Sequence, residues 1–307
     1  MKTEIGTDLL KAIRLLNSGE IVAIPTETVY GLAGNGLNTG AVTKIYNAKR
    51  RPSFNPLILH FPSFQSVVDM LGKNIPPYLE SLVKKFSPGP ITYVINKGKN
   101  VPDITTSGLE TVAFRIPNHP LALKLLEALN FPLAAPSANL FGLTSPTTAQ
   151  HVFDQLHKRV PYILDGGHCS VGVESTILDC TQSQPIIRRF GGTTKEDIEL
   201  WLGIDIKVEV NGSKILSPGM LDSHYSPGIP IDLYSEDEWD LIEPPMGSGF
   251  LSLSKLHPKQ QNQPSIQLSL NRDLNEAATR LFESFRILSQ SNCKRISHIE
   301  CRKKAWA

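Results

Sequence analysis

The chain has 307 residues, of which 31 are Lys or Arg and 29 are Asp or Glu, so its formal net charge is +2. With 40% hydrophobic and 20% charged residues, this is an ordinary soluble globular composition, and the length indicates two domains. The balance excludes a strongly basic nucleic-acid coat protein and an acidic disordered tail.

The chain carries no pattern for a membrane span, a secretory signal or a disulfide framework. Its longest apolar runs, such as residues 56–61, are far too short to cross a bilayer. The first 16 residues lack a basic stretch feeding an apolar segment. The 4 cysteines lie far apart, without the spacing of a zinc site. We therefore expect a reduced, cytoplasmic protein.

Helices and short apolar strands alternate over about the first 200 residues. A first helix is predicted between Thr7, which can cap it, and Gly19, which can end it, and a second opens at Thr39. Further helices are predicted near residues 76–86, 119–129 and 147–158. Short strands are predicted at residues 21–24, 56–61, 89–96, 111–117, 132–139, 161–167 and 175–180. This pattern predicts one α/β domain, residues 1–206, built on a twisted sheet.

The composition changes after this first domain. Residues 207–230 are rich in Gly, Ser and Pro and are typical of a linker. Residues 231–307 predict a small α/β domain with strands at 231–235 and 249–254. Its clearest helix begins at Asp273, with Glu276 three residues later as in a capping box.

Two segments suit phosphate binding, although each also has a plainer interpretation. Residues 25–36 leave a strand as a loop of Thr and Gly, which suits a polar ligand but is also a common turn. Lys49, Arg50 and Arg51 end a helix, where they either face solvent or clamp a polyphosphate. The chain contains no GxxxxGK[ST] string, so this is not a Walker loop.

Other polar residues interrupt apolar strands or follow them. Ser137, Asn139 and Ser145 could hydrogen-bond a nucleotide, or merely belong to the cap of the following helix. Arg115 lies within an apolar strand, so it either meets an anion or points to water from an edge strand. His60 ends another strand, where a half-buried structural histidine is the plainer interpretation.

Seven strings in this order resemble a known family: IPTETVYGL, KRRPSFNPLILH, FSPGPITYVI, TVAFRIPNHP, APSANLFGLTSPT, ILDGG and GVESTILD. Together they resemble the YrdC-type threonylcarbamoyl-AMP synthases over about residues 5–200. SPGMLDSHYSP resembles the linker of the long, two-domain form of that enzyme. The resemblance implies a YrdC-like twisted mixed sheet with surrounding helices and a small C-terminal α/β, Rossmann-like domain.

The resemblance also implies a nucleotidyltransferase. Members of the family form threonylcarbamoyl-AMP and pyrophosphate from L-threonine, bicarbonate or CO2, and ATP. Their product feeds threonylcarbamoylation of adenosine 37 in tRNA, which a downstream transferase complex completes. Magnesium is expected to arrive with the ATP phosphates, no resident metal site is expected, and direct tRNA binding stays open.

The family's site residues carry over by position. Lys49 and Arg51 are the expected catalytic cations. The expected ATP site comprises Arg51, Asn55, Thr111, Ser137, Asn139, Ser145, Arg189, His224 and Tyr225. The expected threonine site comprises Thr28, Lys49, His60, Arg115, Ala135 and Ser175. Arg188 is a rival to Arg189, because the family's usual motif differs from RRFGG at this point. The linker is expected to close over the nucleotide as a lid.

The C-terminus departs from the family pattern. The long form continues into a Gly-rich segment and one more helix, whereas this chain ends in CRKKAWA. Codons for this peptide, read one nucleotide earlier, can spell the Gly-rich segment. We therefore expect residues 301–307 to be a frameshifted tail that leaves the second domain incomplete, with a naturally short variant as the alternative.

Two other functions stay open from sequence. The first is a double-stranded RNA-binding module without catalysis, which the small net charge disfavours. The second is a carbamoyl-transferring maturation factor that shares the domain. Such factors carry zinc modules, for which this chain has no ligand spacing.

Overall fold

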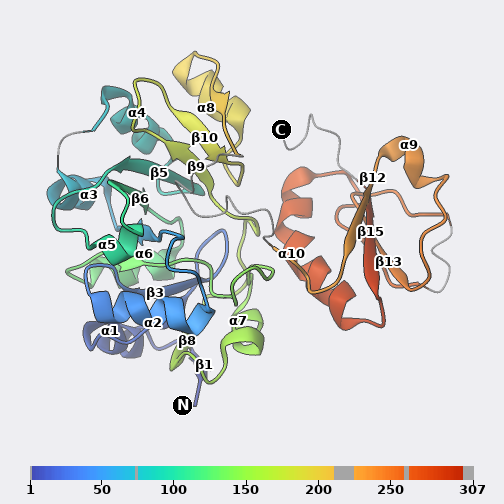
Figure 1. Ribbon diagram of the computed structural model, residues 1–307, viewed down its shortest axis with the longest axis horizontal. Helices are drawn as coiled ribbons and strands as arrows, with labels where there is room; N and C mark the ends of the chain where they lie inside the picture. The colour runs from blue at the N-terminus through green and yellow to red at the C-terminus, as the bar shows by residue number, and fades with distance from the viewer. Residues whose placement is uncertain (1, 73–74, 211–224, 259–262, 300–307) are drawn as a thin grey trace.

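The computed structural model describes residues 2–72, 75–210, 225–258 and 263–299, which form two α/β domains (Figure 1). His224 and the expected frameshifted tail, residues 301–307, lie outside these ranges.

An eleven-stranded mixed sheet forms the centre of the first domain, in the order β1-β8-β2-β3-β7-β4-β6-β5-β9-β10-β11. Its strands are β1 Glu4–Gly6, β2 Val22–Ile24, β3 Gly31–Asn35, β4 Ile58–His60, β5 Ile91–Asn96, β6 Thr111–Arg115, β7 Leu133–Ala134, β8 Tyr162–Leu164, β9 Thr176–Asp179, β10 Ile186–Arg189 and β11 Lys207–Val208. The sheet thus reaches Val208, two residues past the boundary expected at 206.

Helices cover both faces of this sheet (Figure 1). They are α1 Leu9–Asn17, α2 Thr39–Lys49, α3 Phe64–Leu71, α4 Pro77–Phe86, α5 Asp103–Thr106, α6 Pro120–Glu127, α7 Ala149–Leu156 and α8 Lys195–Leu202. Because side chains alternate along a strand, Val22 and Ile24 of β2 pack with α1 and α6, whereas Ala23 packs on the opposite side with α2. The mixed α/β architecture predicted from sequence is confirmed.

The structure corrects some details of the predicted elements. Asp8 rather than Thr7 caps α1, since its carboxylate accepts a hydrogen bond from the amide of Lys11 at 2.9 Å. Asp273 caps α10 as predicted, accepting from the amides of Asn275 and Glu276 at 2.7 and 3.1 Å. The sequence did not predict α3, α5, α8 and α9.

The second domain has a four-stranded parallel sheet in the order β12-β15-β13-β14. Its elements are β12 Ile231–Tyr234, α9 Glu236–Trp239, β13 Ser248–Ser252, β14 Ser265–Gln267, α10 Leu274–Gln290 and β15 Arg295–Ile299. The helix α10 lies on the side of the sheet that faces the first domain (Figure 1). The predicted second α/β domain is therefore present.

The two domains contact each other through α10. Thr279 Oγ1 donates a hydrogen bond to the carbonyl oxygen of Ser170 at 3.0 Å. Gly172, at φ +75°, lies so close that a Cβ atom there would be 2.4 Å from the Cα of Thr279. Val29 of the first domain is buried in the apolar cluster of the second, beside Phe282. The second domain thus packs directly on the loop between β2 and β3.

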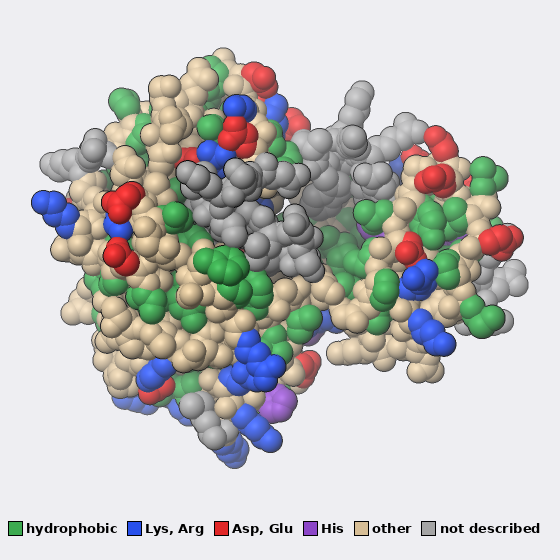
Figure 2. Space-filling view, viewed as in Figure 1, with side chains coloured by type: hydrophobic (Ala, Val, Ile, Leu, Met, Phe, Trp, Pro, Cys, Tyr) green, Lys and Arg blue, Asp and Glu red, His purple; other side chains and the backbone are tan. Residues whose placement is uncertain are grey.

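Charged side chains are unevenly distributed on the surface. On the face shown in Figure 2, Lys and Arg gather at the end of the first domain near α7, and Asp and Glu are scattered over the second domain. None of the helices in the described ranges is long and apolar enough to span a membrane.

Trp239 should be the main stabilising side chain of the second domain. It is 0% exposed and packs edge-on against Phe250 and His257, with ring centroids 6.1 and 5.0 Å away. Trp239→Ala should lower the stability of this domain by about 3–5 kcal/mol. Hydrogen exchange of the β13 and β15 amides would measure the loss. Trp201→Ala, at a position 45% exposed in the first domain, is the control. Equal effects of the two substitutions on these amides would contradict the prediction.

Candidate active site

The parallel pairing of strands brings polar residues from distant parts of the chain to one place. β4 and β6 are parallel neighbours, so His60 and Arg115 lie in register at their carboxyl ends. β5 and β9 are also parallel, and Thr92 Oγ1 lies 2.8 Å from the Oγ of Ser175, which precedes β9. Because β5 runs antiparallel to β6, the amino ends of β5 and β9 lie beside the carboxyl ends of β4 and β6, and the polar residues of these strands meet there.

These strand ends and their loops surround a cavity that is partly open to solvent. Of the residues expected from sequence, those that line it are Arg51, His60, Arg115, Ala135, Ser137, Ser175 and Arg189. The cavity therefore joins the expected ATP-binding and threonine-binding residues in one space. Thr26, Val29, Gly31 and Glu174 also line it.

Lys49 and Arg51 attach the end of α2 to the walls of the cavity. Lys49 Nζ donates to the carbonyl oxygens of Ser137 and Asn139, the latter at 2.7 Å. Arg51 donates to the backbone oxygen of Asn55 at 3.1 Å and to its side-chain oxygen at 2.6 Å. Burial, and after it the neighbouring Arg51, lowers the pKa of Lys49 well below its usual value. Lys49 thus lies behind the cavity wall, where it supports the loop that presents Ser137.

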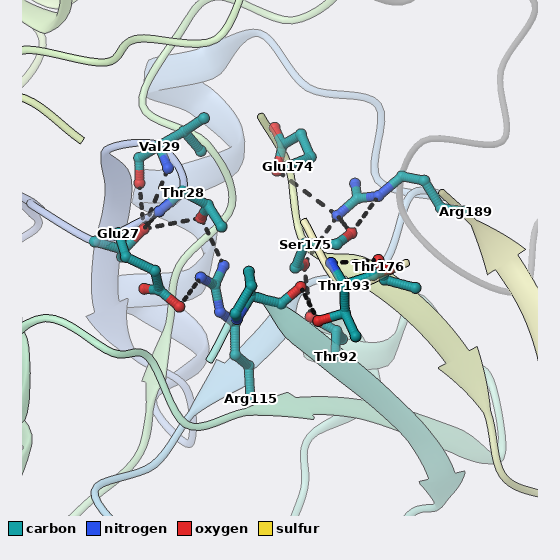
Figure 3. A network of polar contacts seen from close by, with 12 residues as sticks. Glu27, Thr28, Val29, Thr92, Arg115, Glu174, Ser175, Thr176, Arg189 and Thr193 are labelled. Atoms are coloured by element: carbon teal, nitrogen blue, oxygen red, sulfur yellow. Dashed lines mark hydrogen bonds and ion pairs between the residues drawn. The ribbon is translucent and has the colours of Figure 1, made fainter. Parts of the chain in front are cut away.

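Arg189 supports the opposite wall. Its Nε and Nη2 donate to the carbonyl oxygen of Ser175 at 3.0 and 2.9 Å, and Nη2 lies 3.6 Å from a carboxylate oxygen of Glu174 (Figure 3). The other oxygen of Glu174 accepts from Ser145 Oγ at 2.8 Å. Arg188, the alternative to Arg189 that the sequence offered for the ATP site, does not line the cavity and instead pairs with Asp179 at 2.7 Å. The structure therefore favours Arg189 as the cavity residue.

Arg115 carries the charge at the other end of the cavity. Its Nη1 donates to Thr28 Oγ1 at 2.8 Å, and its Nη2 lies 2.8 Å from a carboxylate oxygen of Glu27 (Figure 3). Within the described ranges, Arg115 Nε has no hydrogen-bond partner, although it is buried. An arginine that lines a cavity with a free donor can bind a carboxylate.

The remaining expected residues that the structure describes do not line the cavity, and they lie at three kinds of place around it. Asn55, Thr28, Ser145 and Asn139 lie behind the lining, each hydrogen-bonded to a residue already described. Tyr225 lies near Arg189, and although burial raises its pKa to about 12, that cation opposes the shift. Thr111 begins β6, four residues from Arg115, and does not line the cavity. Its predicted role in ATP binding stays a prediction.

Sequence analysis missed Glu27 and Glu174. Both lie inside the strings IPTETVYGL and GVESTILD, each next to residues with hydroxyl side chains. A lone acidic residue in an otherwise apolar or hydroxylated loop next to a strand was the available signal. Such a residue predicts a buried cation nearby, because a buried carboxylate needs a partner.

The described residues contain no group of three or more His, Cys, Asp or Glu side chains that could hold a metal ion. Cys169, Cys180 and Cys293 are free and buried.

Comparisons with known proteins give the same assignment over both domains. A family model for Sua5, YciO and YrdC proteins, described as telomere recombination, matches residues 14–191. A second model, described as the C-terminal domain of threonylcarbamoyl-AMP synthase, matches residues 193–306.

Individual relatives are similar over most of the chain. The threonylcarbamoyl-AMP synthase of Bacillus subtilis (strain 168) is 46% identical over 227 residues, covering 73% of this chain and 65% of the relative. That of Pyrococcus abyssi is 46% identical over 220 residues, covering 70% and 64%. The chain thus spans just under two thirds of the length of each.

A solved structure, P. abyssi Sua5 complexed with L-threonine, matches with a TM-score of 0.89 at 34% identity. The match covers 99% of this chain and 93% of that one. The likeness therefore extends to the arrangement of both domains.

His60 should make the stability of the protein depend on pH. Burial, and after it Arg115, lowers its pKa to about 3, so the imidazole is neutral when folded. The unfolded state binds a proton below the usual pKa of about 6.5, and stability is lost as pH falls through this window. Between pH 7 and pH 5 this amounts to about 2 kcal/mol.

His60→Gln should therefore flatten the pH dependence measured by urea unfolding, although the variant is less stable at every pH. His151, whose pKa burial lowers to about 4, contributes in the same direction in both proteins. Equal slopes of stability against pH in the two proteins would contradict the prediction.

Proposed function

The chain belongs to the Sua5/YciO/YrdC family and carries the C-terminal domain of threonylcarbamoyl-AMP synthases, and from this premise we propose that it forms L-threonylcarbamoyladenylate. The substrates are L-threonine, bicarbonate or CO2, and ATP, and the second product is pyrophosphate. The observation that carries the proposal is one cavity lined by Arg51 and Arg189 on one side and by Arg115 on the other.

Arg115 suits the carboxylate of threonine. Arg115 lines the cavity, and among the described residues its buried Nε has no hydrogen-bond partner. A guanidinium can bind a carboxylate through two hydrogen bonds. His60, neutral because burial lowers its pKa, adds no competing charge beside it. The P. abyssi relative crystallised with L-threonine supports this assignment.

Arg51 and Arg189 suit the phosphates of ATP. Burial lowers the pKa of Arg51 only to about 10, so its guanidinium keeps its charge at neutral pH. Tyr225 lies beside both cations, which supports the prediction that the linker closes over the nucleotide. Lys49 lies behind Ser137 and holds the loop that faces the phosphates.

In the reaction, the neutral amine of threonine attacks CO2 and loses a proton, which gives a carbamate. A carbamate oxygen then attacks the α-phosphorus of ATP, and the bond to the β-phosphate oxygen breaks as pyrophosphate leaves. The residues of the cavity align the two reactants and neutralise developing charge, which together account for most of the acceleration of such a transfer.

We propose that magnesium enters as part of the substrate, on the ATP phosphates. Among the described residues that line the cavity, Glu174 is the one carboxylate, and its oxygens already face Ser145 and Arg189. A single carboxylate fits a cation that brings its other ligands with it. The product would pass to the proteins that complete threonylcarbamoylation of adenosine 37 in tRNA.

The test is pyrophosphate release with each substrate omitted in turn. Release should require ATP, threonine and bicarbonate together. Arg51→Gln should lower kcat/KM for ATP by about 10²–10³-fold, since it removes a buried charge from the phosphate side. Arg50→Gln is the matched control, because Arg50 is the exposed neighbour at the end of α2.

Three results would contradict the proposal. Pyrophosphate release that does not need threonine would point to another nucleotidyl transfer. Equal losses of kcat/KM for ATP in Arg50→Gln and Arg51→Gln would show that the cavity is not the site of the reaction. No turnover, together with salt-sensitive binding of double-stranded RNA, would favour the non-enzymatic module.

A further inference from the structure

The three arginines that line the cavity differ in how their charges are balanced. Arg189 lies 3.6 Å from Glu174, and Arg115 lies 2.8 Å from Glu27. Within the described ranges, Arg51 bonds only to neutral oxygens, those of Asn55 and the carbonyl of Pro56. Glu174 also acts on Arg51 electrostatically, but within the described ranges Arg51 forms no ion pair, so its charge is the least neutralised of the three.

Glu27 balances Arg115 without lining the cavity. Both side chains are 4% exposed, yet only Arg115 is among the lining residues. The backbone fixes Glu27, because its carbonyl accepts a hydrogen bond from the amide of Val171 at 2.7 Å. Figure 3 shows Glu27 and Thr28 against the guanidinium of Arg115, away from Glu174 and Arg189. Glu27 thus acts on a ligand through Arg115.

No other described cation shares Glu27. Glu27 also acts electrostatically on His119, but burial lowers the pKa of His119 below its usual value. At neutral pH its imidazole is uncharged, so the carboxylate of Glu27 neutralises the guanidinium of Arg115. The net charge of the Glu27–Arg115 pair is close to zero. Because charges interact more strongly in a low-dielectric interior, the missing net charge has a large effect on the attraction of a nearby anion.

The neutral Glu27–Arg115 pair and the charged Arg51 favour different ligands. The amino acid enters as a zwitterion with no net charge, whereas ATP and pyrophosphate carry several negative charges. Without Glu27, Arg115 would offer a bare buried cation to any phosphate or other polyanion that reached this end. With Glu27, the strongest pull on a polyanion lies at Arg51.

We propose that Glu27 is a specificity-determining residue, which neutralises Arg115 from behind so that this end of the cavity accepts a zwitterionic amino acid and rejects polyanions. The inference rests on the proposed function, because it takes Arg115 as the amino-acid end. Glu27 is a positioning residue in this account and does not touch substrate.

The test is equilibrium dialysis of isotopically labelled L-threonine against increasing sodium sulfate, without ATP. Sulfate should not displace threonine from the wild-type protein beyond the effect of sodium chloride at equal ionic strength. In Glu27→Gln, sulfate should compete with threonine, and the concentration that halves threonine binding should be at least about tenfold lower. Glu27→Asp, which keeps the charge, should resist sulfate as the wild type does.

Asp179→Asn is the matched control. Asp179 is a buried carboxylate paired with an arginine, Arg188, at 2.7 Å, and it does not line the cavity. Its loss should destabilise the fold in a comparable way but leave threonine binding insensitive to sulfate. A structural effect of Glu27 alone would make the two variants alike.

The outcomes separate this inference from the function on which it rests. If the wild type binds no threonine, the proposed function fails and the inference with it. If it binds threonine but sulfate acts equally on the wild type and Glu27→Gln, the role of Glu27 is overturned and the function stands. Should Glu27→Gln not fold, displacement of threonine by sulfate from the wild type would still overturn the inference.

Discussion

The structure depends on the burial of positive charge around one cavity. Lys49, Arg51, Arg115 and Arg189 are all buried, and a buried cation is costly unless oxygen atoms surround it. Each of these side chains therefore donates hydrogen bonds to a different loop: Lys49 to the loop after β7, Arg51 to the segment before β4, Arg115 to the loop after β2 and Arg189 to the segment before β9. The hydrogen bonds that these buried cations donate therefore hold the walls of the cavity together.

The order of the strands makes this convergence possible. Thr28, Arg115 and Ser175 are far apart in sequence, but they belong to loops or strand ends that meet at one edge of the eleven-stranded sheet. The second domain adds to the same place, because α10 packs on the loop that carries Thr28 and Val29. A change in that contact acts on the cavity wall itself.

Much of the fold and part of the site could be predicted from sequence. Period and capping predicted α2, α7 and α10, and seven of the residues that the ordered strings implied as a ligand site line one cavity. Pairing between distant charges could not be predicted, since a pattern along the chain does not say which carboxylate meets which cation. Glu27 and Glu174 were missed for that reason. Lys49 was expected to be a catalytic cation in the threonine site, whereas its ammonium lies behind Ser137, where it donates to buried carbonyl oxygens that no pattern along the chain identifies.

A crystal structure with L-threonine and a non-hydrolysable ATP analogue bound together would show most directly whether one cavity holds both substrates. Both should occupy the single cavity, with the threonine carboxylate on Arg115 and the triphosphate against Arg51 and Arg189. A nucleotide bound elsewhere on the molecule, or a triphosphate on Arg115, would contradict this prediction.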